Sequence, residues 1–317
     1  MLPTTLVGSF PLDYSIANIR KTLEDQFKLG VTFPVLPQLR DFVYIYLQPL
    51  LAQGIVLKEG LGYRLAKDIN EAEIEVPEDV LIAADVAREM GLKYRVPITG
   101  PFTLASKIAL PNGRIGDIST SAVTEKKTLE SIVEYMGKLA RKIDSEVKGH
   151  LYCVDEPVLA VIVGSRNIMY GYSPEFIHDK LDYVLSNLSG EMRGIHVCGK
   201  LPPLLKQILL NLQNAGFLDH EHSDFPANRT YYSREELLKS SKKLGYGIIS
   251  PSKPSVENKE IVLSLAKDAY DRYGDAIAFF KPDCGFGGLK GYLGGREYEE
   301  IVLEKIKLLV EVAEEVS

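Results

Sequence analysis

Tryptophan is absent from this 317-residue chain, and cysteine is rare, with only three residues. Three cysteines do not make a disulfide framework in a chain of this size, and in a reducing compartment they are free to bind a metal. No apolar run approaches the ~20 residues that span a bilayer. The first residues lack the basic segment and apolar core of a secretory signal. We therefore expect a cytoplasmic protein that has no membrane partner.

An excess of basic charge is also missing. The chain has 37 Lys and Arg against 43 Asp and Glu, which gives a formal net charge of -6. This balance supplies no electrostatic attraction for nucleic acid or for an anionic membrane, so we expect neither as a partner. The length is sufficient for one large core, and we expect a single domain over residues 1–317.

Short apolar runs alternate with longer amphipathic stretches along the chain. Such short runs are typical of buried parallel strands, and the longer stretches have helical periodicity. The eight apolar runs cover residues 5–7, 31–36, 94–98, 151–154, 193–197, 215–218, 246–249 and 276–280. The helical stretches cover residues 14–29, 41–53, 77–90, 117–147, 174–188, 202–214, 233–244, 256–273 and 297–316. Eight alternations of strand and helix predict an α/β fold, a (β/α)8 TIM barrel.

Local signals refine this prediction. Helix starts are marked by Ser173-Pro174 and by Ser233 with Glu236 three residues later. The stretch 58–75 has the pattern of a β-hairpin insertion with its turn near 60–62. A doubly wound open sheet of seven or eight strands gives nearly the same pattern, and it stays open as the alternative fold.

Polar or conformationally permissive residues stand at the C-terminal end of every predicted strand. In a TIM barrel these ends and the loops that follow them form the active site. The residues are Gly8-Ser9, Gln38, Thr99-Gly100, Asp155-Glu156, His196 with Cys198, Glu221, Ser250 and Asp283-Cys284. We therefore expect a single pocket at this end of the barrel.

Four of these residues make a candidate metal site: His196, Cys198, Glu221 and Cys284. An imidazole, two thiolates and a carboxylate suit zinc. His196 and Cys198 are two residues apart, so both side chains point to the same side of a strand. Ligands contributed by three separate strand ends are typical of a functional site rather than a purely structural one.

Each candidate ligand has a structural alternative. His196 and Cys198 can be core residues of a buried strand, and either histidine beside Glu221, at 220 or 222, can ligate in its place. The third cysteine, Cys153, has no such companions, and we expect it to be a small core residue.

Two further motifs also have structural interpretations. Asp155 can cap the following helix instead of binding a substrate. The glycine-rich segment 285–288 lacks the Lys and Ser/Thr of a phosphate-binding loop, and we expect a close-packed turn beside the metal.

Several short motifs carry a resemblance to a known family. They are the segment 3–11 (Pro-Thr-Thr-Leu-Val-Gly-Ser-Phe-Pro), Val-Asp-Glu-Pro at 154–157, His-Val-Cys at 196–198, Glu-His-Ser at 221–223, Ser-Pro-Ser at 250–252 and Pro-Asp-Cys-Gly at 282–285. In these segments the chain resembles the catalytic domain of cobalamin-independent methionine synthase. It resembles in particular the short archaeal form, which consists of that domain alone and is a (β/α) barrel.

The resemblance implies zinc-dependent methyl transfer to the thiol of homocysteine. The thiolate is the nucleophile, and a free thiol with a pKa near ~8.5 is mostly protonated at neutral pH. Zinc with an open coordination position supplies the ionised sulfur. The family pattern favours Glu221 over its neighbouring histidines as a ligand, and it implies that Asp155 and the backbone around Ser9 hold the amino acid part of the substrate.

Three departures from the family pattern bear on the substrates. Gln38 stands where many members have a Glu that binds the substrate ammonium. Ile249 stands where the family has a histidine that is regarded as the proton donor in the folate-dependent reaction, and the chain lacks the Trp that the long enzymes place against the pterin. We therefore expect the methyl donor to be a methylcorrinoid, either methylcobalamin or a corrinoid protein, rather than a polyglutamated methylfolate; a methylated pterin stays open as an alternative donor.

Two other functions stay open. One is zinc-dependent alkyl transfer to or from a different thiol such as coenzyme M, since Gln38 alters the homocysteine site. The other is a subunit of a split methionine synthase, with structural zinc and a separate partner chain. The decarboxylase of uroporphyrinogen is similar only in fold, and the cysteines argue against its chemistry.

Overall fold

The computed structural model describes residues 2–316, and six parallel strands form its central sheet. The strand order is β3-β5-β6-β7-β8-β9, so consecutive strands are neighbours apart from β4, which belongs to another sheet. The six strands are β3 (Arg95–Thr99), β5 (Leu151–Asp155), β6 (Met192–Val197), β7 (Phe217–His220), β8 (Lys243–Ile249) and β9 (Ile277–Pro282). Parallel pairing places all their carboxyl ends at one rim.

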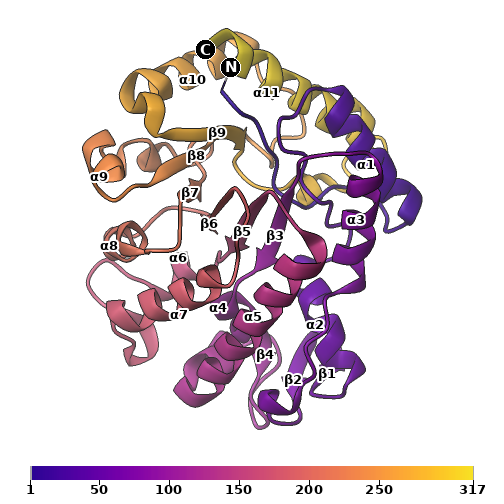
Figure 1. Cartoon of the computed structure of the whole chain (residues 1–317), viewed down its shortest axis with the longest axis vertical. Helices are drawn as coiled ribbons and strands as arrows, with labels where there is room; N and C mark the ends of the chain where they lie inside the picture. The colour runs from indigo at the N-terminus through magenta and orange to yellow at the C-terminus, as the bar shows by residue number, and fades with distance from the viewer. Residues whose placement is uncertain (1, 317) are drawn as a thin grey trace.

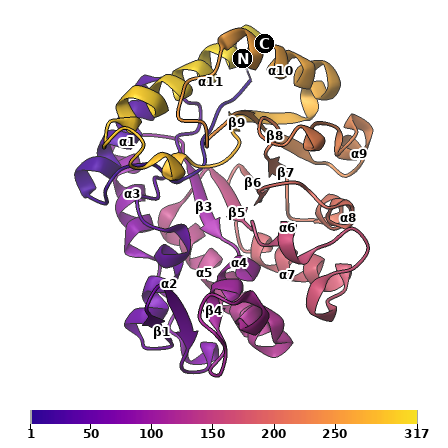
Figure 2. The same ribbon diagram turned by 180° about the vertical axis from the view of Figure 1, so that it is seen from behind.

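Two N-terminal segments close this sheet into a ring. Thr4 forms a parallel bridge with Phe280 of β9, and the adjacent Thr5 forms one with Phe33. The second segment then pairs with β3 through a bridge between Val35 and Arg95. Figures 1 and 2 show the first segment beside β9 and the helices around the outside. The predicted (β/α)8 barrel is confirmed, and the open doubly wound sheet is excluded.

The helices cover the outside of the ring, and most begin where the sequence predicts. Ser173 caps its helix, and Ser233 forms the predicted capping box with Glu236. The helices are α1 (Ile16–Lys28), α2 (Phe42–Ala52), α3 (Glu78–Glu89), α4 (Pro101–Lys107), α5 (Lys126–Val147), α6 (Leu159–Ile162), α7 (Pro174–Ser186), α8 (Pro203–Asn211), α9 (Arg234–Lys239), α10 (Lys259–Tyr273) and α11 (Leu303–Val316). No helix within residues 2–316 combines the length and the apolar character needed to cross a bilayer.

The predicted insertion is a hairpin, but it starts earlier and is shorter than expected. Its strands are β1 (Val56–Glu59) and β2 (Gly62–Leu65), and the short strand β4 (Ile108–Ala109) extends the sheet by pairing in parallel with β2. The remainder of the predicted stretch, to residue 75, holds only a 3-10 turn. The predicted helix 233–244 was also too long: α9 ends at Lys239, and Ser241 has a positive φ of 55° before β8 begins.

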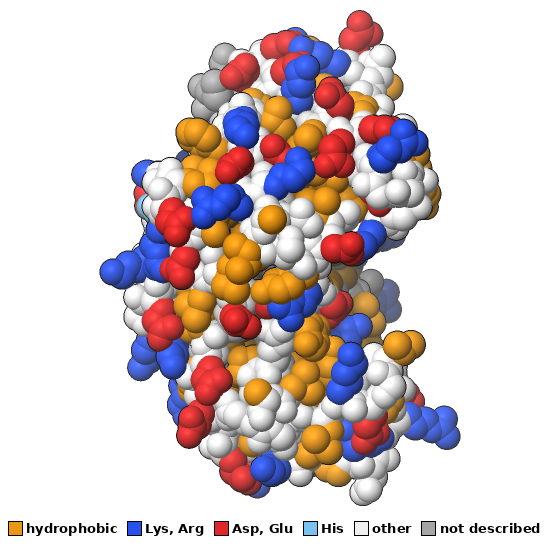
Figure 3. All heavy atoms as spheres, turned by 90° about the vertical axis from the view of Figure 1, so that its right-hand side faces the viewer, with side chains coloured by type: hydrophobic (Ala, Val, Ile, Leu, Met, Phe, Trp, Pro, Cys, Tyr) orange, Lys and Arg blue, Asp and Glu red, His pale blue; other side chains and the backbone are white. Residues whose placement is uncertain are grey.

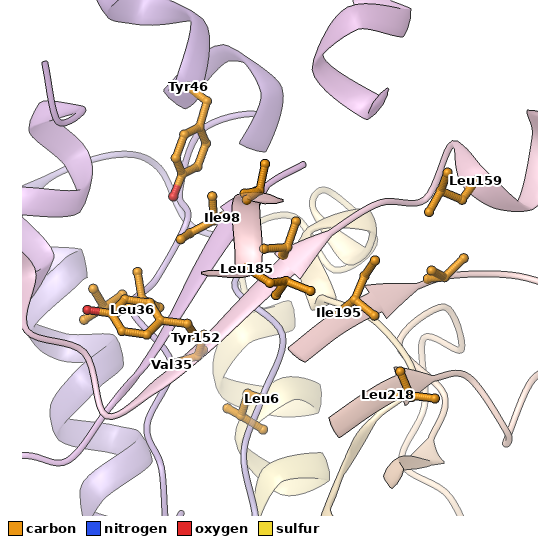
Figure 4. Close-up of a cluster of buried hydrophobic side chains, with 14 of the residues drawn as sticks. Leu6, Val35, Leu36, Tyr46, Ile98, Tyr152, Leu159, Leu185, Ile195 and Leu218 are labelled. Carbon is orange, nitrogen blue, oxygen red and sulfur yellow. The ribbon is translucent and has the colours of Figure 1, made fainter. Parts of the chain in front are cut away.

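Apolar packing fills both sides of the barrel wall. Between the strands and the outer helices, strand residues such as Ile98 and Ile195 meet helix residues such as Tyr46 and Leu185 (Figure 4). Inside the ring a smaller buried cluster fills the end away from the carboxyl rim; its members are Leu151, Cys153, Phe217, Ala278 and Phe279. On the face drawn in Figure 3, acidic and basic side chains are interspersed over the helices.

The inner packing depends on a glycine in β6. A Cβ atom added to Gly194 would lie 2.3 Å from the carbonyl oxygen of Phe217 and 2.5 Å from its ring. Backbone of the neighbouring strand cannot move aside as a flexible side chain can. Phe217 therefore needs a residue without a side chain two positions before His196.

We predict that Gly194→Ala lowers the free energy of unfolding by about 1–3 kcal/mol, the usual cost of overpacking. Gly216→Ala is the control, because its Cβ would meet nothing closer than 3.6 Å; we expect a change within about 0.5 kcal/mol. Denaturant unfolding followed by circular dichroism measures both. Equal effects of the two substitutions would contradict this account of the barrel interior.

Candidate metal and substrate site

Three of the four predicted ligands meet at the carboxyl rim. His196 is the second-to-last residue of β6, and Cys198 directly follows the strand. Cys284 lies in the loop after β9. The ligand atoms of the three residues lie within 4.8 Å of one another. His196 Nε2 is 2.8 Å from the sulfur of Cys198, which is 3.5 Å from the sulfur of Cys284. The imidazole is buried and both cysteines are half-buried.

Glu221 borders this cluster without belonging to its compact core. It follows the last residue of β7 and is largely buried, and its Oε2 accepts a hydrogen bond from the backbone N–H of Gly199 at 2.5 Å. Burial raises the pKa of Glu221, and the negative charge of Cys284 adds to that rise. The carboxylate is therefore close enough to the sulfurs to interact with them electrostatically.

Buried side chains tie the ligand-bearing loops together. Asp283 accepts hydrogen bonds from the backbone N–H groups of residues 222, 223 and 224, so the residue before Cys284 holds the turn after Glu221. Asn228 donates to the carbonyl oxygens of Gly199 and Glu221 at 2.9 and 2.8 Å. The loops after β6, β7 and β9 thus form one connected unit. No sequence motif pointed to Asn228, which lies in the 3-10 helix Pro226–Thr230 after β7.

Asp219 fixes the orientation of His196, and sequence reasoning missed it. Its Oδ1 lies 2.8 Å from Nδ1 of His196, on the side of the ring opposite Cys198. A metal-ligating histidine normally donates its other ring N–H to such a carboxylate. The predicted strand ended at 218, before this residue. The available signal was that Asp219 stands two positions before Glu221 and so shares its face of the strand.

Charge is distributed unevenly over the three side chains of the cluster. Burial alone would lower the pKa of His196, but the Asp219 carboxylate outweighs burial and the pKa is about 10. The hydrogen bond from Cys198 holds the pKa of Cys284 well below that of a free thiol, and the same contact together with burial raises the pKa of Cys198. These shifts favour the imidazolium of His196, the thiol of Cys198 and the thiolate of Cys284, and each group is within hydrogen-bonding distance of another.

The alternative ligands lie elsewhere. His220 contacts the carbonyl oxygen of Val197 and the hydroxyl of Tyr232, and burial lowers its pKa to about 3. His222 stacks on Tyr246 with ring centroids 3.7 Å apart. Both histidines point away from the barrel axis, because they alternate along the chain with Asp219 and Glu221. Cys153 belongs to the apolar cluster inside the ring, as predicted.

The predicted substrate residues lie at the same rim, with β3 between the segment of Gln38 and the strand of Asp155. Ser9 and Gln38 form a parallel bridge, and Asp155 is level with His196 in the register of β5 and β6. Gln38 Nε2 and Asp155 Oδ1 are buried and have no hydrogen-bond partner among the described residues. Burial raises the pKa of Asp155 to about 6. These orphaned polar atoms are available to a polar ligand.

Two of the structural alternatives can be judged from the contacts. Asp155 caps no helix within residues 2–316; the neighbouring Glu156 performs that role, accepting the backbone N–H groups of Phe102 and Thr103 at the start of α4. The glycine-rich segment is a close-packed turn: a Cβ on Gly285 would lie 2.1 Å from Oγ of Ser9. Ile249 is fully buried.

A cleft of about 660 Å³ opens on the side of the rim that carries Asp155. Pro157 and Val158, which follow Asp155-Glu156, form one wall of this cleft, and the β1–β2 hairpin forms another. Its lining is mainly apolar, with two lysines and one aspartate. The lining residues include Asp41, Phe42, Val43, Lys58, Leu61, Tyr63, Thr103, Lys107, Pro157, Val158 and Val161.

Comparisons with known proteins agree with this architecture. No family model matches the chain. A protein named methionine synthase from Methanothermobacter thermautotrophicus is 29% identical over 312 aligned positions, which cover 89% of this chain and 92% of that protein. The methionine synthase of Pyrococcus horikoshii is 21% identical over 322 positions, covering 90% and 86%.

Solved structures show the same fold. A B12-independent methionine synthase from Shewanella sp. W3-18-1, in complex with selenomethionine, superposes with a TM-score of 0.70 at 15% identity and covers 100% of this chain and 98% of that one. The barrel is therefore of the B12-independent methionine synthase type. By sequence the chain is a homologue of the short archaeal methionine synthases.

The protonation of the cluster predicts how metal binding depends on pH. His196 and Cys198 hold protons at neutral pH and must lose them to ligate, so each zinc ion releases about two protons. The metal-free form binds more protons, so raising the pH favours the zinc form. We expect the apparent association constant to rise by about two log units per pH unit between about pH 6 and 8. Chelator competition in buffers of different pH measures this slope. A pH-independent affinity would contradict the assignment.

Proposed function

We propose that the protein is a zinc-dependent methyltransferase that transfers a methyl group to the thiol of homocysteine, giving methionine. The observation that carries the proposal is the convergence of His196, Cys198 and Cys284 at the carboxyl rim of a barrel. The homology to archaeal methionine synthases supports the same function.

The chemistry of the donor set fits zinc. Two sulfurs and an imidazole are borderline-soft ligands, and His196, Cys198 and Cys284 would hold the ion with Glu221 beside them. When bound, zinc supplies the Lewis acidity that keeps a substrate thiol ionised at neutral pH. The chain itself supplies the orientation, because Asp219 fixes the imidazole, and Asp283 and Asn228 fix the loops.

The orphaned polar atoms near the cluster suit the amino acid part of homocysteine. Asp155 provides an anionic partner for the ammonium group, and its unpartnered Oδ1 is the available acceptor. Gln38 Nε2 is an unpartnered donor, and a donor suits the substrate carboxylate rather than the ammonium. The backbone around Ser9 closes the same side of the rim.

The methyl donor that we propose is a methylcorrinoid. In the transfer the substrate sulfur forms a bond to the methyl carbon while the bond between that carbon and the donor breaks. Cobalt(I) keeps the bonding electron pair and leaves without a proton, whereas the amine of a methylfolate must be protonated to leave. The buried Ile249 cannot donate a proton. The cleft beside Asp155 has apolar walls with Lys58 and Lys107, which suits a bulky donor with an anionic group.

Loss of a ligand tests the metal centre. We expect Cys284→Ala and His196→Ala to lower zinc affinity by more than about 100-fold, because even partners behind the ligands contribute about 10–100-fold, and to abolish methyl transfer. Cys153→Ala is the matched control, since Cys153 is buried in the apolar cluster; it should keep one zinc per chain. Metal analysis after dialysis gives the result, and full zinc content in Cys284→Ala would show that the ligand is wrongly assigned.

The donor is tested by supplying the zinc-loaded protein with homocysteine and either methylcobalamin or a methylated pterin. Methionine formation should be rapid with methylcobalamin and slow with the pterin, because the latter needs a proton at the position of Ile249. Rapid turnover with the pterin alone would reject the corrinoid.

A different thiol is the second candidate acceptor. The observation that favours it is Gln38, a neutral amide where many members of the family have a Glu. Of the three predicted substrate residues, only Asp155 then has a carboxylate to bind an ammonium group. The same assay with coenzyme M in place of homocysteine discriminates between them, since coenzyme M has no ammonium group for Asp155. Preference for coenzyme M would replace homocysteine as the substrate and leave the metal centre unchanged.

A further inference from the structure

Three charged side chains lie inside the barrel without any exposure to solvent: Arg95 of β3, Asp219 of β7 and Lys281 of β9. They come from three different strands of the ring and meet behind His196. Asp219 Oδ1 lies 2.8 Å from His196 Nδ1 and 2.8 Å from Lys281 Nζ. Its Oδ2 lies 2.8 Å from a guanidinium nitrogen of Arg95. Both oxygens of one carboxylate are thus engaged.

Stability alone does not account for this cluster. Replacing buried ion pairs by well-packed apolar residues is often neutral or stabilising. The adjacent part of the barrel interior is filled by Leu151, Phe217 and Phe279, so this ring accommodates apolar filling. The charged cluster occurs where the interior meets His196. Its position therefore points to a role at the ligand rather than in the core.

The cluster determines which nitrogen of His196 carries a proton in the metal-bound state. Lys281 holds Asp219 in place and is itself anchored to the carbonyl oxygens of Pro282 and Asp283, directly before Cys284. An ionised carboxylate only accepts hydrogen bonds, so Nδ1 of His196 must be the donor. Nε2, the nitrogen that faces Cys198, is then left as the ligand atom.

With His196 neutral, as it would be when it ligates a metal, the formal charges of this layer balance. Arg95 and Lys281 supply two positive charges, and Asp219 and the nearby Asp155 supply two negative ones; the field of Arg95 reaches both carboxylates. Losing Asp219 alone would leave a buried cation without its partner, which typically destabilises a protein strongly. A test must therefore remove a cation and an anion together.

We propose that Arg95, Asp219 and Lys281 form a positioning relay that presents Nε2 of His196 to the metal and links its orientation to the backbone of the Cys284 loop. This inference rests on the metal centre of the proposed function. All three side chains are fully buried behind His196, so they are positioning residues rather than catalytic ones.

The first measurement uses the wild-type protein. In zinc-loaded protein with 15N-labelled histidine, long-range 1H–15N correlation spectra should show His196 protonated at Nδ1 and ligating through Nε2. Ligation through Nδ1 overturns the relay while leaving the metal centre intact. A wild type that takes up no zinc overturns the proposed function and the relay together, so the two failures are distinguishable.

The second measurement uses the charge-balanced variant Asp219→Asn/Lys281→Met. We expect its zinc affinity, from chelator competition, to fall about 10–100-fold, and the His196 signals to shift. The control is Glu257→Gln/Lys305→Met, which removes another buried ion pair, 2.8 Å apart, between the loop after β8 and α11; it should lose stability and keep its zinc affinity. Wild-type affinity in the first variant, or an equal loss in both, overturns the relay.

Discussion

Closure of the strand ring is the constraint on which the site depends. The parallel bridges of the N-terminal segments to β9 and β3 make eight strands run in one direction around a common axis. All carboxyl ends then meet at one rim, and residues almost 90 positions apart, such as Cys198 and Cys284, come within 3.5 Å. Without closure, the segments that carry Ser9 and Gln38 would not lie between β9, which leads to Cys284, and β3.

The fold could be predicted from the sequence because strands that are buried on both faces are continuous apolar runs. All eight apolar runs correspond to strands or bridged segments of the ring. The rim residues were readable for a related reason: a polar residue directly after such a run marks the end of a parallel strand. This rule placed Cys198 directly after its run and Cys284 shortly after the run that ends at 280; His196 was placed by its position two residues before Cys198, and Cys153, inside a run, was separated from them.

The same rule explains what the sequence did not reveal. Asp219 and Lys281 lie inside β7 and β9. Each is a charged residue directly after an apolar run, at 218 and 280, and a charge in that position predicts that the strand has ended. A buried charge is tolerated only with its partner, and the partners Arg95 and Asp219 are more than 120 positions apart. Such pairing is a property of the closed ring. The role of Asn228 could not be predicted, because its side chain joins two loops by donating to their backbone carbonyl oxygens. No local sequence pattern indicates such contacts.

The candidate metal ligands and the lining of the cleft come from different halves of the chain. All the ligand-bearing loops come from residues 196–284, whereas the cleft beside Asp155 is lined only by residues 41–161, including the hairpin that precedes β3. Remodelling the hairpin or α4 therefore leaves the thiolate-bearing half untouched. Under the proposed function, a barrel built in this way can exchange one methyl source for another over evolutionary time while it keeps the same acceptor chemistry.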